Sequence, residues 1–207
     1  MGFPMHPLDK ALGDITSIRR QVARTTEFRG YGAATLAATG VFAMIAAVTQ
    51  YFLLPDPSNQ IGNYLRIWVT TAIVSATLIG MQTFTRTRRI HSGLADEMIL
   101  MAVEQFLPSV GAGALISIVL IRFVPACTWM LPGFWQITFS LGVFASCRFL
   151  PKPMAVAGSW YLLTGLACIG LGDTRALTPW TMGIAYGVGQ LLVAAVLLWG
   201  SKEDQDA

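Results

Sequence analysis

Residues 94–123 read LADEMILMAVEQFLPSVGAGALISIVLIRF, and this stretch decides the fold class. Its second half is almost wholly apolar and is long enough for a helix to cross a hydrocarbon core, which needs about 20 such residues. Its first half carries Glu104 and Gln105 shortly before Pro108. The segment therefore predicts a membrane-spanning helix with polar groups at one end that need an explanation of their own.

The composition of the whole chain agrees with a membrane protein. Of the 207 residues, 54% are hydrophobic and 12% are charged, and the mean hydropathy is +0.58. Soluble domains carry about 25% charged residues. The three cysteines have no CxxC spacing and the chain has two histidines, so we expect no metal site and no cofactor.

Apolar segments of spanning length recur six times along the chain. They are 31–54, 64–84, the opening stretch to Val124, 128–147, 153–172 and 179–200. Pro132, Pro153 and Pro179 stand at or near three of the expected helix starts, where proline is tolerated. The expected fold is all-α, with a cytoplasmic arm (1–30), a transmembrane bundle of six helices (31–200) and a short cytoplasmic tail (201–207).

The distribution of lysine and arginine predicts the orientation. Eleven of these residues fall in the arm, the tail and the two links that share their side, whereas only Arg66, Arg122 and Arg175 fall on the other side. By the positive-inside rule, both termini are expected in the cytoplasm, and an even number of spans follows. We expect a multi-pass protein of a cytoplasmic (inner) membrane, of bacterial type.

The arm from 8 to 29 has apolar residues at gaps of four, three, three and four, which is the spacing of one helix face. Arg19, Arg20 and Arg24 point elsewhere on that helix. The pattern predicts an amphipathic helix on the inner leaflet, with these arginines at the membrane surface. The alternative is an arm that docks a cytoplasmic protein partner.

Two geometries would explain Glu104. If one unbroken helix passes through Pro108, the proline displaces the carbonyl of residue 104, and an ionisable group inside the membrane is a candidate for proton coupling or cation binding. If the span begins at Pro108 instead, residues 93–107 form an interfacial helix and Glu104 lies near water. The sequence leaves both open.

Other polar and aromatic side chains interrupt the later spans and form the predicted ligand site. On 179–200, Tyr186 and Gln190 stand four residues apart on one helix face. Helix bundles often hold ligands between facing helices, although glutamines can simply hydrogen-bond across helices. The candidate ligand or proton-coupling residues are Glu104, Gln105, Trp135, Gln136, Tyr161, Tyr186 and Gln190.

Small residues also recur at helical spacing. Gly183 and Gly187 form a GxxxG pair in the last span, and such pairs let helix backbones approach closely. The pattern fits packing inside the bundle as well as it fits a homodimer.

Catalytic and nucleotide-binding signatures are absent from the sequence, since it has no Walker loop, no Ser-His-Asp set, no HExxH and no dinucleotide fingerprint. The basic residues follow membrane topology and predict no nucleic-acid partner. We expect a non-enzymatic protein that binds or transports a small apolar or weakly cationic molecule between the third and sixth helices. The alternative is a membrane scaffold or accessory subunit, and a membrane enzyme ranks third.

Overall fold

The computed structural model describes residues 32–90, 93–147 and 153–203. The N-terminal arm, with Arg19, Arg20 and Arg24, lies outside the described residues, as does most of the C-terminal tail. Helices make up the ordered elements of the described part, which contains no strand. In chain order they are α2 (Ala33–Leu53), α3 (Ile61–Ile90), α4 (Gly93–Phe123), the 3₁₀ helix η1 (Pro125–Met130), α5 (Leu131–Ser146), α6 (Met154–Gly170), the 3₁₀ helix η2 (Thr174–Leu177) and α7 (Pro179–Glu203).

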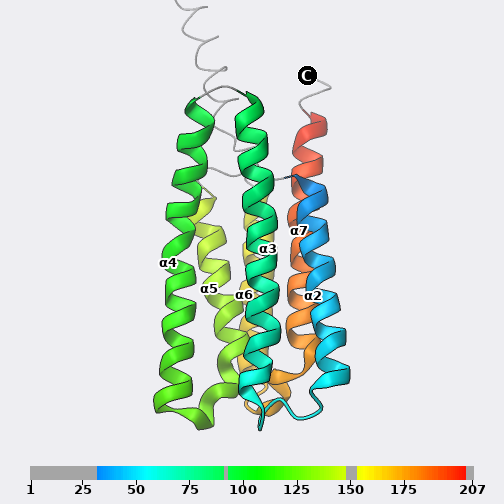
Figure 1. Cartoon of the computed structure of the whole chain (residues 1–207), viewed down its shortest axis with the longest axis vertical. Coiled ribbons are helices and arrows are strands. Elements are labelled where there is room, and N and C mark those ends of the chain that lie inside the picture. Colours follow the sequence, from blue (N-terminus) through cyan, green and yellow to red (C-terminus); the bar gives the residue numbers. More distant parts are fainter. Residues whose placement is uncertain (1–31, 91–92, 148–152, 204–207) are drawn as a thin grey trace, which may run out of the picture.

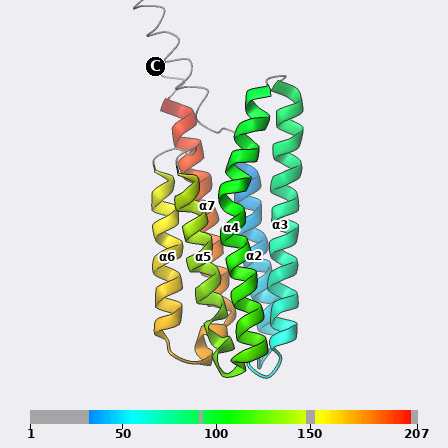
Figure 2. The ribbon, with the colours of Figure 1, turned by 90° about the vertical axis from the view of Figure 1, so that its left-hand side faces the viewer.

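The α-helices run side by side along one axis and alternate in direction (Figures 1 and 2). The turns from α2 to α3, from α4 to α5 and from α6 to α7 gather at one end of the bundle, which we call the loop end. The start of α2 and the end of α7 lie at the opposite end. This is the alternation that the sequence predicted, and the prolines at 132, 153 and 179 stand at helix starts as expected.

Within the described residues, four helices are long and apolar enough to cross a membrane: Ala33–Leu53, Ile61–Gln82, Glu104–Phe123 and Pro179–Leu198. The other two are shorter than predicted, with 16 residues in α5 and 17 in α6. At about 1.5 Å per residue they are roughly 24 and 26 Å long. Part of the fourth predicted span, 128–130, belongs to η1 instead, where a tighter coil precedes Pro132.

The outer surface of the bundle carries many large apolar side chains, while some polar side chains are buried inside it. Large apolar side chains such as Phe52, Leu115 and Leu163 are 65–72% exposed, whereas the glutamines at 50 and 136 are fully buried. In water, a surface of this kind would cost free energy in proportion to its apolar area. Apolar surroundings remove that cost, so the burial pattern supports the composition in indicating a membrane protein.

The first and last helices of the described part pack closely together. A Cβ atom built on Gly183 of α7 would lie 2.5 Å from the Cβ of Ala47 on α2, and one on Gly40 would lie 3.0 Å from the carbonyl oxygen of Gly187. The GxxxG pair therefore faces α2 within the same chain. Gly183 and Gly40 are needed where they are, because a side chain at either would meet a rigid part of the other helix and push the two helices apart.

The turns at the loop end are held by carboxylates. Asp56 accepts hydrogen bonds from Ser58 and Asn59, and these bonds lower the pKa of its carboxyl. Between α6 and α7, Gly172 adopts a φ of 72° and Asp173 caps η2 through the backbone N–H of Arg175. The guanidinium of Arg175, 2.8 Å away, likewise lowers the pKa of Asp173.

Candidate functional site

Helix α4 runs without a break through Pro108, which is the first of the two geometries considered for Glu104. The Glu104 side chain is nevertheless exposed, as is that of Gln105. Helix α4 meets α5 through Gly113, whose built Cβ would contact Thr138 and Trp135. Glu104 lies nine residues earlier, about 180° around the helix from that face, and so points away from the bundle interior.

Trp135 is brought to the interface of three helices. Its indole Nε1 donates to the Ser117 hydroxyl of α4 at 2.8 Å, and its ring stacks on Tyr64 of α3, with centroids 6.3 Å apart. The indole N–H is therefore already paired, so Trp135 can offer only its aromatic ring to a ligand.

Gln136 lies one residue further along α5 and is fully buried. Its Nε2 donates to the Thr181 carbonyl of α7 at 3.1 Å, whereas its Oε1 has no hydrogen-bond partner. Gly165 of α6 packs against its Cβ. Gln136 thus reaches from α5 to α7 while its acceptor oxygen stays unpaired.

Aromatic rings link four helices at the next level of the bundle. Phe139 of α5 lies 4.7 Å from the ring of Tyr161 on α6, 5.5 Å from Tyr186 on α7 and 5.1 Å from Phe106 on α4. Tyr161 and Tyr186 lie 5.3 Å apart. Tyr161 and Tyr186, two of the candidate site residues, therefore lie close together in the structure.

The Tyr161 hydroxyl is fully buried and lies against Gly189 of α7. The side chain of Gln190, the next residue, lies beside this hydroxyl. No hydrogen bond within 3.5 Å joins the two side chains, and the Gln190 Oε1 is also unpaired. On its other side Gln190 packs against Gly40 of α2. It therefore lies between α2, α6 and α7.

Ser140 belongs to the same group, although the sequence did not single it out. It is one helical turn after Gln136, fully buried, and its hydroxyl has no partner. Helices α5 and α6 contact each other at Gly133 with Gly165 and at Phe144 with Gly158, which places Ser140 between these two contacts, level with Tyr161. Serines are common in apolar spans, so the sequence alone does not single out Ser140. Only the register of α5 against α6 places it in this group.

We call Gln136, Ser140, Tyr161 and Gln190 the polar core. Each is at least nine-tenths buried, and each presents one polar atom without a hydrogen-bond partner. An unpaired polar atom in such a place costs about 1–3 kcal/mol, so four together need an explanation. Within the described residues, no cluster of histidine, cysteine, aspartate or glutamate could hold a metal ion.

A second polar group, which sequence analysis missed, lies nearer the loop end. Gln50 of α2 accepts from the Trp68 indole of α3 at 2.7 Å and donates to the Leu177 carbonyl at 2.7 Å. A lone glutamine in the first apolar span could have drawn attention to it. Because both ends of this amide are paired, we assign Gln50 a structural role and not a ligand site.

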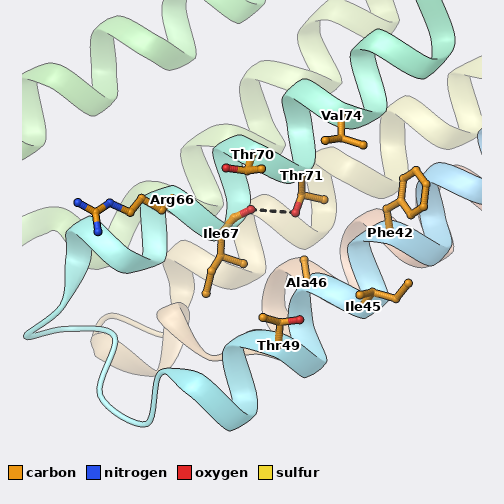
Figure 3. A pocket seen from close by; sticks show the side chains of 9 residues that line it. All are labelled: Phe42, Ile45, Ala46, Thr49, Arg66, Ile67, Thr70, Thr71 and Val74. Atoms are coloured by element: carbon orange, nitrogen blue, oxygen red, sulfur yellow. Dashed lines mark hydrogen bonds between the residues drawn. The ribbon is translucent and has the colours of Figure 1, made fainter.

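An open groove lies apart from the polar core, on the outer side between α2 and α3 (Figure 3). Its volume is about 420 Å³.

The chain was also compared with family models, curated proteins and solved structures, and none of the three comparisons finds a match.

Proposed function

We propose that the chain is a six-span protein of a cytoplasmic membrane with both termini inside. Four helices of the described part have spanning length, and the shorter α5 and α6 run alongside them from the loop end, although their opposite ends stop short of the ends of α3, α4 and α7 (Figures 1 and 2). A helix as short as α6 can span where the bilayer thins locally. The excess of arginine and lysine on the side of the termini supports the orientation.

The topology can be tested by cysteine labelling from outside, on a cysteine-free background. A cysteine at Ser58, in the turn between α2 and α3, should react, whereas a cysteine at Ser92 should not. The reverse pattern would contradict the orientation. Labelling of both positions in sealed vesicles would contradict the assignment of the two turns to opposite sides.

We propose further that the polar core binds a small, mainly apolar or weakly cationic molecule. The observation that carries this proposal is the set of unpaired polar atoms on Gln136, Ser140, Tyr161 and Gln190. Two of these atoms are amide oxygens, which can only accept, so the matching ligand has N–H or O–H donors. The rings of Phe139, Tyr161 and Tyr186 supply apolar contacts and π faces that favour a weakly cationic group.

Transport is the extension of this proposal, because a buried site at mid-bundle suits a molecule that passes between the two sides. The exposed position of Glu104 gives proton coupling through this residue no support. A donor-bearing neutral molecule or an amine needs no such coupling to bind. We therefore propose binding as the primary property and passage as its consequence.

The test is native mass spectrometry of the full chain after purification in a mild detergent. We expect a non-protein mass below that of a lipid to remain bound to the wild type. Gln136→Leu and Gln190→Leu each remove one unpaired acceptor and should release that mass. Gln60→Leu, at an exposed position in the turn before α3, is the matched control and should retain it.

Retention by both core variants, or a wild-type protein that carries no such mass, would contradict the binding proposal. Circular dichroism of each variant checks that the helices are intact. This measurement separates loss of the ligand from loss of the fold.

The second candidate is a scaffold or accessory subunit, with the N-terminal arm docking a cytoplasmic partner. The observation that favours it is the exposure of α3 and α4, where only 11% and 6% of the spanning windows are buried inside the chain. The corresponding share is 39% for α2 and for α7. Affinity purification after crosslinking at exposed Ile73 and Leu115 would recover a partner protein if scaffolding is the function, and only lipid otherwise.

A further inference from the structure

Two hydrogen bonds join α2, or the residue before it, to α3 on the side where the groove lies. Near the loop end, the Trp68 indole of α3 donates to Gln50 of α2 at 2.7 Å. Near the other end, the backbone N–H of Gly32 donates to the Gln82 side chain at 3.2 Å. The groove opens outward within the spanning part of both helices, and its lining extends past Trp68 toward the loop end as far as Arg66.

The lining of the groove is apolar along most of its length (Figure 3). Helix α2 contributes Phe42, Ile45, Ala46 and Thr49, and α3 contributes Arg66, Ile67, Thr70, Thr71 and Val74. From Val74 to Arg66 the groove follows about 12 Å of α3. Its 420 Å³ fall within the ~300–1,000 Å³ typical of small-molecule sites.

A cation lies at one edge of this apolar lining. The Arg66 side chain leaves α3 away from the apolar side chains of the groove (Figure 3). Its Nη1 donates to the Asn63 side chain at 3.3 Å, toward the loop end. No carboxylate of the described residues forms an ion pair with Arg66, in contrast to Arg175, which is paired with Asp173.

Hydroxyl groups lie between the cation and the apolar end. Thr71 donates its hydroxyl proton to the Ile67 carbonyl of its own helix at 2.8 Å. The hydroxyls of Thr49 and Thr70 make no hydrogen bond with any described residue, so they are free to donate to ester oxygens. The order from the loop end inward is thus guanidinium, hydroxyls and hydrocarbon.

We propose that this groove binds one anionic phospholipid, with its phosphate on Arg66 and one acyl chain between α2 and α3. Arginine suits the phosphate because its planar fork can donate two parallel hydrogen bonds. The groove opens to the hydrocarbon core, so an acyl chain reaches it without leaving the bilayer. The site is separate from the polar core and does not depend on the function proposed there.

The charge component is tested by native mass spectrometry of the full chain titrated with phosphatidylglycerol or with phosphatidylcholine in detergent. We expect the wild type to retain one phosphatidylglycerol in preference to phosphatidylcholine. Arg66→Gln should lower that preference about fivefold, the factor equivalent to ~1 kcal/mol for one basic residue beside anionic lipid. Arg122→Gln is the matched control, because Arg122 is an exposed arginine near the loop end that does not line the groove.

The acyl component is tested with two phenylalanine variants. Thr70→Phe places a ring in the groove and should reduce the retention of both lipids. Val69→Phe, at the neighbouring exposed position outside the lining, should leave retention unchanged. Wild-type retention of phosphatidylglycerol by both Arg66→Gln and Thr70→Phe, equal losses in the controls, or no lipid preference in the wild type would overturn the proposal.

Discussion

The side-chain oxygen of Gln50 accepts a 2.7 Å hydrogen bond from the indole nitrogen of Trp68, and this bond joins α2 to α3 inside an otherwise apolar layer. The same amide donates to the Leu177 carbonyl before α7. One side chain therefore connects α2, the neighbouring α3 and the distant turn before α7.

Replacement of this amide should weaken the bundle. Gln50→Leu keeps the approximate volume but leaves the Trp68 N–H and the Leu177 carbonyl without their partner, so we expect a loss of about 1–3 kcal/mol of stability. Thermal unfolding in detergent, followed by circular dichroism, measures the change. The exposed Gln60→Leu should shift the midpoint little, and an equal shift in both variants would contradict the prediction.

The contact between α2 and α7 should tolerate no added side chain at Gly183. Gly183→Ile places atoms where Ala47 already lies 2.5 Å from a built Cβ, so the helices must separate, at a cost of about 1–3 kcal/mol or more. Gly111→Ile is the matched control, because nothing lies within 4 Å of a Cβ built there. Thermal unfolding midpoints of the two variants test this prediction, and an equal midpoint in both would contradict it.

Removal of one hydroxyl from the polar core should stabilise the empty protein and weaken binding. Tyr161→Phe deletes a buried hydroxyl that has no partner and keeps the ring against Phe139. We expect stability to rise by about 1 kcal/mol, while the retained small molecule is lost in native mass spectrometry. A variant that loses stability would show that this hydroxyl is satisfied in the folded protein.

Neutralisation of Glu104 should have little effect. The side chain is exposed on α4 and pairs with no other described residue, so Glu104→Gln should change stability by less than about 0.5 kcal/mol. Retention of the bound molecule in native mass spectrometry should match that of the wild type. A loss of binding in this variant would contradict the prediction and show that Glu104 takes part in binding.

Sequence patterns predicted the elements of the fold better than their contacts. Apolar runs bounded by proline and asparagine fixed the helices to within a few residues for α2, α4 and α7. The start of α5 was wrong because the apolar run from 128 does not distinguish a 3₁₀ turn from an α-helix. The length of α3 was underestimated because its last turns are polar and carry arginines.

The candidate site was predicted in part. Gln136, Tyr161, Tyr186 and Gln190 could be found because polar and aromatic side chains are conspicuous in apolar spans, and the structure brings them together. Glu104 and Gln105 do not join them, since rotation about the α4 axis decides which face meets α5 and hydropathy carries no information on that rotation. Ser140 could be assigned only from the register of α5 against α6.

The pairing of the first described helix with the last has a consequence for assembly of the protein during synthesis. The carbonyl that pairs with Gln50 lies 127 residues later in the chain, and Gly40 packs against Gly187, which is synthesised later still. At about 5–20 residues per second, some 6–25 s pass before that partner leaves the ribosome. During this interval the Gln50 Nε2 has no carbonyl to donate to and the small residues of α2 have no partner helix, so we expect α2 to need an insertase or another temporary neighbour.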